Sequence, residues 1–257
     1  MELEVERNFT KNVRSELCRL NKDLIYPSIP LERLLELRSK VSKIPELTHN
    51  PEIYYMNREE ILDRTIRYSR VLNEFAGREN LTEDEFTVVL RMFAEGSPIG
   101  YSLGFFRGIF IVQASQAQKD KYLPLIDSMK IVGSFAQTEL GHGSNVRGIE
   151  TTATYEPRTG MFVINSPTLT STKWWIGNLG INSNYAIVIA RLILNDSDYG
   201  PHPFFIQLRD LETHEPFEGV ELGDIGPKLG INSIDNGYAR FESSGYPENL
   251  YSIDSLM

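Results

Sequence analysis

The chain has 257 residues, 41% of them hydrophobic and 24% charged, which is the composition of an ordinary globular protein with one large or two modest domains. Its net charge of −9 argues against nucleic acids as partners and leaves open a local basic patch for one small anionic ligand. Because Cys18 is the only cysteine, intrachain disulfides and thiolate metal clusters are excluded, and a reducing compartment fits best.

The part of the chain before residue 133 predicts helices. Two segments carry a capping box, in which a cap residue is followed three positions later by a glutamate: Asn57 with Glu60, and Thr82 with Glu85. Behind each box, apolar residues recur at helical spacing and predict a buried stripe: Ile61, Tyr68, Leu72 and Phe75, then Phe86, Val89, Leu90 and Phe93. Gly96 predicts the end of the second helix, and residues 30–41 and 115–129 are further helix candidates.

The most apolar stretch of the sequence lies at residues 100–114. Arg107 interrupts this stretch, which is also too short to cross a bilayer, so we expect a buried helix and no membrane span. Residues 1–20 mix charged and polar residues and lack the apolar block of a secretory signal.

From Gly133 onward the sequence predicts β structure, and 14 of the 19 glycines lie in this part. Alternating segments at 150–156 and 161–166 flank the turn sequence at 157–160, which predicts a hairpin. The remaining strand candidates are rich in branched and aromatic residues and cover 185–194, 203–208 and 238–243. Pro247 is expected near the first turn of a new helix.

The sequence therefore divides into a helical domain at 1–133, a β domain at 134–250, and the start of a further helical region at 251–257. The loop at 136–145, AQTELGHGSN, lies at the join, where its two glycines and many polar side chains favour a turn over regular structure. A join between domains is a common place for a small-molecule site, so we expect this loop to contact a ligand.

The adjacent residues Trp174 and Trp175 are the only tryptophans, and Gly177 and Gly180 follow them. In extended backbone the two indoles would point to opposite faces, so at most one would pack into the β core. The other needs an apolar partner, either a flat cofactor ring or another domain, and composition alone favours the domain.

Three motifs in this order resemble those of the peroxisomal acyl-CoA oxidases, in the acyl-CoA dehydrogenase superfamily: Thr-Glu-x-Gly-His-Gly at 138–143, Lys-Trp-Trp-x-Gly at 173–177, and Asp-Ile-Gly-Pro-Lys at 224–228. The resemblance runs from about Tyr54 to Leu250, by pattern more than by identical residues in the helical part. It implies an α+β fold, with an N-terminal helical domain followed by an antiparallel β-barrel or sandwich domain that binds flavin.

The resemblance also implies a reaction. Acyl-CoA oxidases use FAD and molecular oxygen to oxidise a fatty acyl-CoA to trans-2-enoyl-CoA, with hydrogen peroxide as the second product. A carboxylate removes the α proton, and the β hydrogen leaves as hydride to the flavin, which requires the base, thioester and flavin to be in line. The family further implies peroxisomal localisation and fatty-acid β-oxidation.

Carried onto this chain, the resemblance places Thr138, Gly143, Ser144, Trp175 and Gly177 at the flavin. Thr138 would bond the pyrimidine edge, Gly143 and Ser144 would present backbone N–H groups, and Trp175 would pack on the flavin face with Trp174 supporting it. Gly177 stands where dehydrogenases keep a threonine or serine. The segment that approaches the acyl-CoA would be Asp235, Asn236 and Gly237.

Other polar residues have simpler interpretations. Glu139 is not the base in this family, and His142 is a loop histidine that we expect to form hydrogen bonds or face solvent. Lys173 and Lys228 could each meet a phosphate, but we expect solvated surface lysines. The four scattered histidines do not have metal-ligand spacing, so no metal site is predicted.

The main departure from the family is that the long C-terminal helical region, which carries the catalytic glutamate, has no counterpart here. No catalytic residue is therefore assigned, and the isolated chain is expected to be inactive. We expect a truncated or partial acyl-CoA oxidase that forms a homodimer or a heterodimer with a full-length relative. The alternatives are a non-catalytic partner or regulator of such an enzyme, and an acyl-CoA- or flavin-binding module without turnover.

Overall fold

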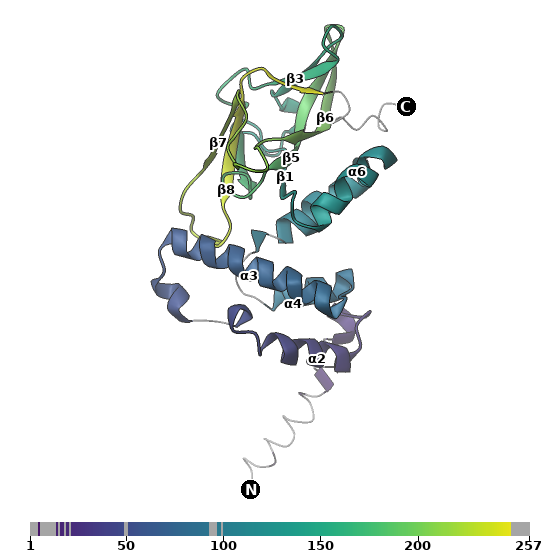
Figure 1. Ribbon diagram of the computed structural model, residues 1–257, viewed down its shortest axis with the longest axis vertical. Coiled ribbons are helices and arrows are strands. Elements are labelled where there is room, and N and C mark those ends of the chain that lie inside the picture. Colours follow the sequence, from purple (N-terminus) through teal and green to yellow (C-terminus); the bar gives the residue numbers. More distant parts are fainter. Residues whose placement is uncertain are drawn as a thin grey trace. The chain divides into compact units, whose positions relative to one another are not determined.

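The computed structural model describes residues 22–48, 51–92, 97–98 and 100–247, with a few scattered positions between residues 5 and 20 (Figure 1). The chain divides into two compact units, each considered by itself. The first takes its described residues from Met1–Met56 and Ile66–Glu95, and the second from Asn57–Thr65 and Gly96–Met257. Within the described ranges, no helix is long and apolar enough to cross a membrane.

The first unit is helical. It contains α2 (Leu31–Val41), α4 (Glu83–Arg91), the two short 3₁₀ helices η1 (Pro45–Leu47) and η2 (Pro51–Tyr55), and the part of α3 (Arg58–Glu79) that follows Thr65. Its core joins these elements through buried apolar side chains: Leu37, Val41, Leu47, Tyr68, Leu72, Phe75 and Val89. The predicted stripes are confirmed at Tyr68, Leu72, Phe75 and Val89, whereas Ile61 is only half-buried.

Both predicted capping boxes are present. The backbone N–H of Glu60 donates to Asn57 Oδ1 at 3.0 Å, and the N–H of Asn57 donates to Glu60 Oε2 at 2.7 Å. Thr82 and Glu85 form the same reciprocal pair at the start of α4. Each box satisfies two backbone donors that the first helical turn leaves without partners, which is why these helices begin where they do. The predicted Phe93 and Gly96 lie outside the described residues.

The second unit begins its main part with three helical segments, η3 (Gly100–Phe106), α5 (Arg107–Gln113) and α6 (Gln116–Asp127). The predicted helix at 100–114 is confirmed, but its first half is a π-helix, a rare widened form that is frequent at functional sites. Burial is also only partial. Phe106 and Phe110 are buried, whereas Phe105 and Val112 are 55% and 77% exposed, so the expectation of a buried helix holds for one face only.

Two sheets complete the second unit (Figure 1). In the larger sheet, β1 (Gly133–Ala136) and β2 (Thr152–Glu156) both pair with one side of β5 (Tyr185–Leu194), and β6 (Ser197–Gln207) pairs with the other. β3 (Met161–Asn165) and β9 (Ser244–Pro247) extend this sheet beyond β2. The smaller sheet has the order β4 (Lys173–Gly177), β8 (Asn236–Phe241) and β7 (Val220–Asp224).

Most pairings are antiparallel, as predicted, but β1 and β2 run parallel to β5 and follow one another along its edge. The α+β class is confirmed, and the described strands form two sheets rather than a closed barrel. The predicted hairpin is present as β2 and β3. Pro247 is the last residue of β9, opposite Met161, and not in a first helical turn. The proposed helical start at 251–257 lies outside the described residues.

The strand β5 is buried on both faces, which explains its uninterrupted apolar sequence. Tyr185 and Ile187 face the helices, where they join Phe106, Phe110, Tyr122 and Phe205. Ala186, Val188, Ala190 and Leu192 face the smaller sheet and join Ile176, Ala239 and Phe241. Because successive side chains of a strand point to opposite faces, one strand supplies both cores of this unit.

Phe205 gives the first prediction, because its ring lies 4.7 Å from Phe110, 4.9 Å from Tyr122 and 5.0 Å from Tyr185, between centroids. Phe205→Ala should lower the free energy of unfolding by about 3–5 kcal/mol, through lost burial and the cavity left behind. Urea unfolding followed by circular dichroism measures the change. Val112→Ala, at a site 77% exposed, is the control and should change stability little. Equal effects of the two substitutions would contradict this core assignment.

Candidate functional site

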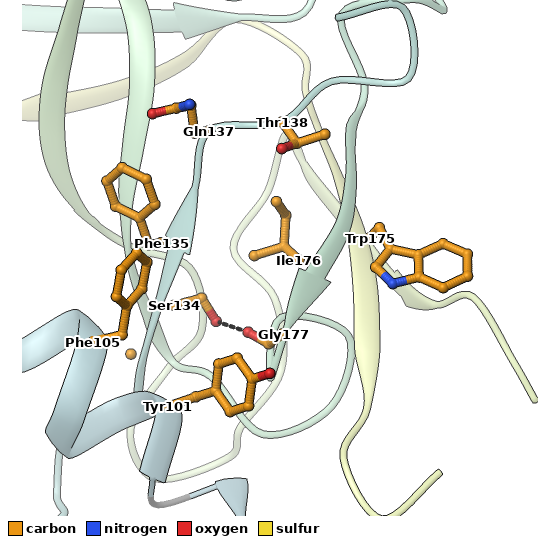
Figure 2. Close-up of a pocket in the computed structure, with 10 residues that line it drawn as sticks. Tyr101, Phe105, Ser134, Phe135, Gln137, Thr138, Trp175, Ile176 and Gly177 are labelled. Atoms are coloured by element: carbon orange, nitrogen blue, oxygen red, sulfur yellow. Dashed lines mark hydrogen bonds between the residues drawn. The ribbon is translucent and has the colours of Figure 1, made fainter. Parts of the chain in front are cut away.

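A pocket of about 240 Å³ lies in the second unit, between η3, β1 and β4 (Figure 2). Four of its lining residues are aromatic: Tyr101, Phe105, Phe135 and Trp175. The others are Gly133, Ser134, Gln137, Thr138, Ile176 and Gly177. The first and second sequence motifs, which are separated by about 30 residues, therefore meet at one concave surface, and Thr138, Trp175 and Gly177 are the predicted site residues that it brings together.

Gly177 forms the floor of the pocket beside Tyr101. A Cβ atom at this position would lie 3.2 Å from Cδ1 of the Tyr101 ring, so any larger residue would displace that ring or fill the pocket. The carbonyl oxygen of Gly177 accepts a hydrogen bond from the Ser134 hydroxyl at 2.8 Å, which joins the end of β4 to β1. Gly177 therefore leaves the space beside the Tyr101 ring open, while the hydrogen bond from Ser134 fixes its backbone.

Trp175 lies at an irregularity in β4. The pairing of β4 with β8 shifts register between Lys173 and Ile176, and Trp175 has a φ of 65°, a left-handed backbone conformation that is unusual for a large side chain. Its indole is 55% exposed and, in Figure 2, lies on the opposite side of β4 from Tyr101. Trp174 stacks on Tyr238 of β8, with ring centroids 6.2 Å apart. The bulge therefore turns the second indole outward.

Gln137 and Thr138 present polar side chains to the pocket. Neither side chain has a hydrogen-bond partner among the residues that the structure describes. An amide and a hydroxyl in this state can bond the polar edge of a heterocyclic ring, and the aromatic walls can contact its faces. These residues fit one edge of a flavin. At about 240 Å³ the pocket is smaller than the sites that enclose a drug-sized ligand, so it admits only part of that cofactor.

Gly143 and Ser144 lie on the exposed loop after the first motif, outside the lining of the pocket. A Cβ atom built at Gly143 meets no other atom within 4 Å, so the protein itself does not require glycine there. Their predicted contact with a cofactor therefore stays a prediction.

The predicted substrate residues Asp235, Asn236 and Gly237 have clear structural contacts. The buried Asp235 carboxylate accepts from the N–H of Ile181 at 2.9 Å and from Asn182 Nδ2 at 2.5 Å, and burial raises the pKa of Asp235. A Cβ at Gly237 would lie 2.1 Å from the backbone of Gly180. Asp235 and Gly237 thus hold the turn after β4 against β8.

Asn236 differs from its two neighbours because it is only half-buried. Its Nδ2 donates to the carbonyl of Trp175 at 3.0 Å, which connects the start of β8 to the bulge in β4. A role of all three residues in binding substrate stays a prediction.

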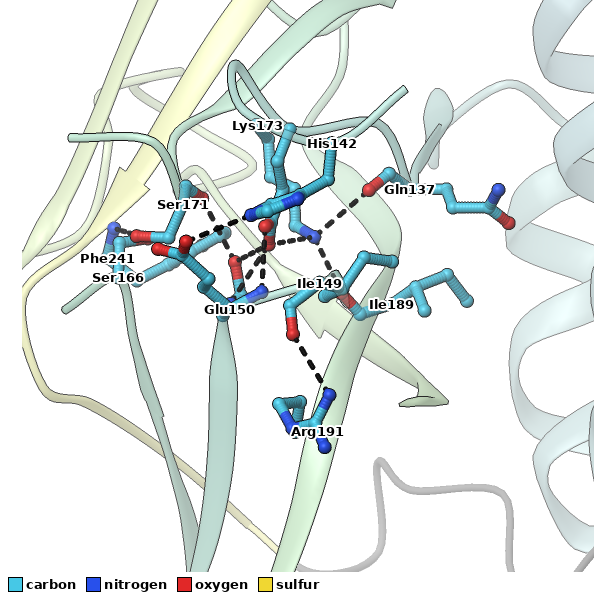
Figure 3. A network of polar contacts seen from close by, with 12 residues as sticks. Gln137, His142, Ile149, Glu150, Ser166, Ser171, Lys173, Ile189, Arg191 and Phe241 are labelled. Carbon is cyan, nitrogen blue, oxygen red and sulfur yellow. Dashed lines mark hydrogen bonds and ion pairs between the residues drawn. The ribbon is translucent and has the colours of Figure 1, made fainter. Parts of the chain in front are cut away.

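A buried ion pair joins the first motif to the start of β4, within the polar network drawn in Figure 3. Lys173 Nζ is 3.0 Å from Glu139 Oε1, and neither side chain is exposed. Glu139 also accepts from the backbone N–H of Thr151 at 2.9 Å and of Glu150 at 2.8 Å. The expectation that Lys173 is a solvated surface lysine is therefore wrong, because this network supplies the partners that a buried ammonium requires.

Lys228 also departs from the expectation. It is half-buried, and its ammonium group donates to the carbonyl of Ile234 at 2.7 Å. Sequence spacing could not indicate either lysine's partner, because the acceptors come from distant or irregular segments.

His142 joins the same network at its exposed edge. Its Nε2 is 2.9 Å from Glu150 Oε1, while Glu150 Oε2 accepts from the hydroxyl groups of Thr168 and Thr170. These hydrogen bonds, that of Thr168 most strongly, lower the pKa of the Glu150 carboxyl. His142 is thus a hydrogen-bonding loop histidine, as expected. The described residues contain no cluster of three or more His, Cys, Asp or Glu side chains that could hold a metal.

Sequence reasoning missed the residues of η3 that complete the pocket. Tyr101 and Phe105 are exposed by 45% and 55% although they lie in the most apolar stretch. Their spacing of four residues places both on one helix face. Two aromatic residues on one helix face, rather than the overall hydrophobicity, were the sequence signal that could have indicated this side of the pocket.

Two protein-family models together match nearly all of the residues that the structure describes. Residues 28–132 match the acyl-coenzyme A oxidase N-terminal family, and residues 134–244 match the acyl-CoA dehydrogenase middle domain. Among curated proteins, the acyl-coenzyme A oxidase acox-1.3 of Caenorhabditis elegans is 41% identical over 220 residues, covering 84% of this chain and 33% of that protein. Peroxisomal acyl-coenzyme A oxidase 1 of Homo sapiens is 38% identical over 223 residues, covering 85% and 34%.

Solved structures agree with these matches. The acyl-CoA oxidase of tomato, Lycopersicon esculentum, superposes with a TM-score of 0.82 at 40% identity, covering 86% of this chain and 34% of that one. Acyl-CoA oxidase-1 of Caenorhabditis elegans, solved with FAD and ATP, gives 0.82 at 37% identity, covering 87% and 35%. The chain thus spans about a third of the length of the relatives it matches.

The buried position of Lys173 gives a pH prediction. Burial lowers the pKa of Lys173 to about 8, against the opposing effect of the Glu139 charge. Between about pH 8 and about 10.4, the ordinary lysine value, the unfolded chain then binds more protons than the folded one. The contribution of this group to the free energy of unfolding should therefore rise with pH across that window.

Nuclear magnetic resonance of labelled lysine side chains tests this directly. One signal, absent in Lys173→Arg, should titrate near pH 8. If the Lys173 signal titrates only near the ordinary value of about 10.4, the Glu139 charge and the hydrogen bonds fully offset the effect of burial, and the predicted pH dependence is wrong.

Proposed function

Since this chain belongs to the acyl-CoA oxidase family, we propose that it serves the FAD-dependent oxidation of fatty acyl-CoA to trans-2-enoyl-CoA in peroxisomal β-oxidation. The observation that carries the proposal is the pocket in which Thr138 of the first motif and Gly177 of the second lie together. The chain spans about a third of its relatives, so we assign it the flavin-facing part of the site.

Bound FAD would accept the β hydrogen of the acyl group and pass the electrons to oxygen, which yields hydrogen peroxide. The residues of this chain would hold and orient that cofactor. Thr138 and Gln137 would bond its polar edge with side chains that lack other partners, and the exposed backbone of Gly143 and Ser144 would approach it. Gly177 would leave room beside Tyr101. For Trp175 to cover a ring face, its indole would have to turn from the outer side of β4, where it lies 55% exposed (Figure 2).

The proton-accepting group is a separate requirement. None of the described residues that line this pocket carries a carboxylate, and the nearby Glu139 already bonds Lys173 and backbone donors. A positioned general base contributes about 10²–10⁴-fold to the rate, so a pocket without one should not support turnover. We propose that the base is supplied by a helical region of the kind that completes the family's site.

Association with a relative would supply that region. We propose a dimer with a full-length acyl-CoA oxidase, or with a second copy of this chain. The loop after β7 exposes Leu229 and Ile231, 108% and 61% accessible, as apolar contacts for such a partner. We also propose a peroxisomal location, which the names of the curated relatives support.

Cofactor binding tests the flavin assignment. The purified 257-residue chain alone should bind FAD weakly or not at all, because its pocket admits only part of the cofactor. Adding a full-length relative should recover FAD in the mixed complex, as measured by flavin absorbance after size-exclusion chromatography. Stoichiometric FAD retained by the chain alone would show that the pocket needs no further surface.

Peroxide release tests the catalytic assignment. With palmitoyl-CoA and added FAD, the chain alone should produce no peroxide, and the C-terminal region of a relative supplied in trans should restore activity. Gly177→Trp should then abolish it, because the new side chain collides with Tyr101 and fills the pocket. Val112→Trp, at an exposed site, is the matched control. Peroxide release by the isolated chain that one internal Glu→Gln change removes would overturn the assignment.

A further inference from the structure

We infer that Lys173 is a positioning residue for the pocket, whose single buried ammonium group fixes the Thr138 wall against the Trp175–Gly177 wall. The identity of the ligand, FAD, rests on the proposed function. The geometry rests on the contacts of this chain alone.

The first step is that Lys173 holds both neighbours of Thr138. Its Nζ donates to the carbonyl of Gln137 at 3.2 Å and to Glu139 Oε1 at 3.0 Å. The N–H of Trp174 also donates to the carbonyl of Thr138 at 3.0 Å. Thr138 therefore cannot move away from β4 without breaking one of these bonds.

The second step concerns the other wall, which begins two residues after Lys173. Trp175 has left-handed backbone geometry within the bulge, and such a conformation persists only where its surroundings fix it. Lys173 fixes the start of the bulge. The hydrogen bond from Ser134 to the Gly177 carbonyl fixes its end.

The third step concerns β5, the strand to which Lys173 connects both walls of the pocket. The remaining proton of the Lys173 ammonium goes to the carbonyl of Ile189, in the middle of β5, at 2.7 Å. An ammonium group has three donors, and here two of them have acceptors in the loop at 136–145 and the third has its acceptor in β5. In the part of the chain that the structure describes, the hydrogen bonds of Lys173 link the second motif to both the first motif and β5.

The informative variant is the double substitution Glu139→Gln/Lys173→Met. It removes both charges at nearly constant volume, so no buried charge is left unpaired, unlike Lys173→Met alone. Asp198→Asn is the control, because it breaks the Arg191–Asp198 ion pair between β5 and β6 of the larger sheet without touching a residue of the pocket.

Two measurements report on the pocket. Trp174 and Trp175 are the only tryptophans, so intrinsic fluorescence and its quenching by acrylamide report on β4 directly. FAD affinity is measured in the presence of the C-terminal region of a relative. The double variant should show altered tryptophan quenching and about 10- to 100-fold weaker FAD binding, the range seen when a residue that orients a metal ligand is removed. The control should match the wild type in both.

A double-mutant cycle distinguishes a displacement of Thr138 from a general loss of order in the protein. Thr138→Ala should weaken FAD binding in the wild type and have little further effect in the double variant, because Thr138 is then already displaced. Unchanged quenching and FAD affinity in a folded double variant would overturn the inference while leaving the proposed function intact. If the complemented wild type binds no FAD, the proposed function fails, and the tryptophan signal alone decides the role of Lys173.

Discussion

The two buried faces of β5 are the constraint on which the second unit depends. Its helix-facing side chains join the aromatic cluster around Phe205, and its other face joins the core between the sheets. β1, β2 and β6 all pair with β5. The position of β5 therefore fixes β1 and, with it, the start of the loop that lines the pocket. Lys173 adds a further connection, because its ammonium group donates to the carbonyl of Ile189 in β5. The loop and the bulge that form the pocket are therefore both held by a strand that is buried on both faces.

The polar groups around the pocket divide according to whether the fold already satisfies them. Glu139 and Lys173 satisfy one another and the backbone around them, and a buried charge with several donors is a structural element. Thr138 and Gln137, on the same stretch of chain, keep side chains without partners in the described structure. Side chains that the fold satisfies and side chains without partners thus lie next to each other at residues 137–139, which supports the proposal that this short loop both holds the protein together and contacts a ligand.

The features that could be predicted from the sequence are those that depend on residues close together in the chain. Capping boxes, apolar stripes and the hairpin turn act over a few residues, and both boxes and the β2–β3 hairpin are present. The sequence could not predict the parallel pairing of β1 with β5, the bulge at Trp175 or the acceptors of Lys173, because each depends on segments that meet only in the folded chain. The motif residues were found by resemblance, whereas Tyr101 and Phe105 belong to no motif and were found only through the pocket they line.

Gly177 and Gly237 show why residue type alone does not separate function from packing. A Cβ at Gly237 would lie 2.1 Å from backbone nitrogen, which cannot move aside, so glycine is required there by the fold. A Cβ at Gly177 would meet only the edge of the Tyr101 side chain at 3.2 Å, and that ring is 45% exposed and able to yield. The fold therefore tolerates more at 177 than at 237. A strict need for glycine at 177 would have to come from whatever occupies the pocket, whereas the need at 237 holds with the pocket empty.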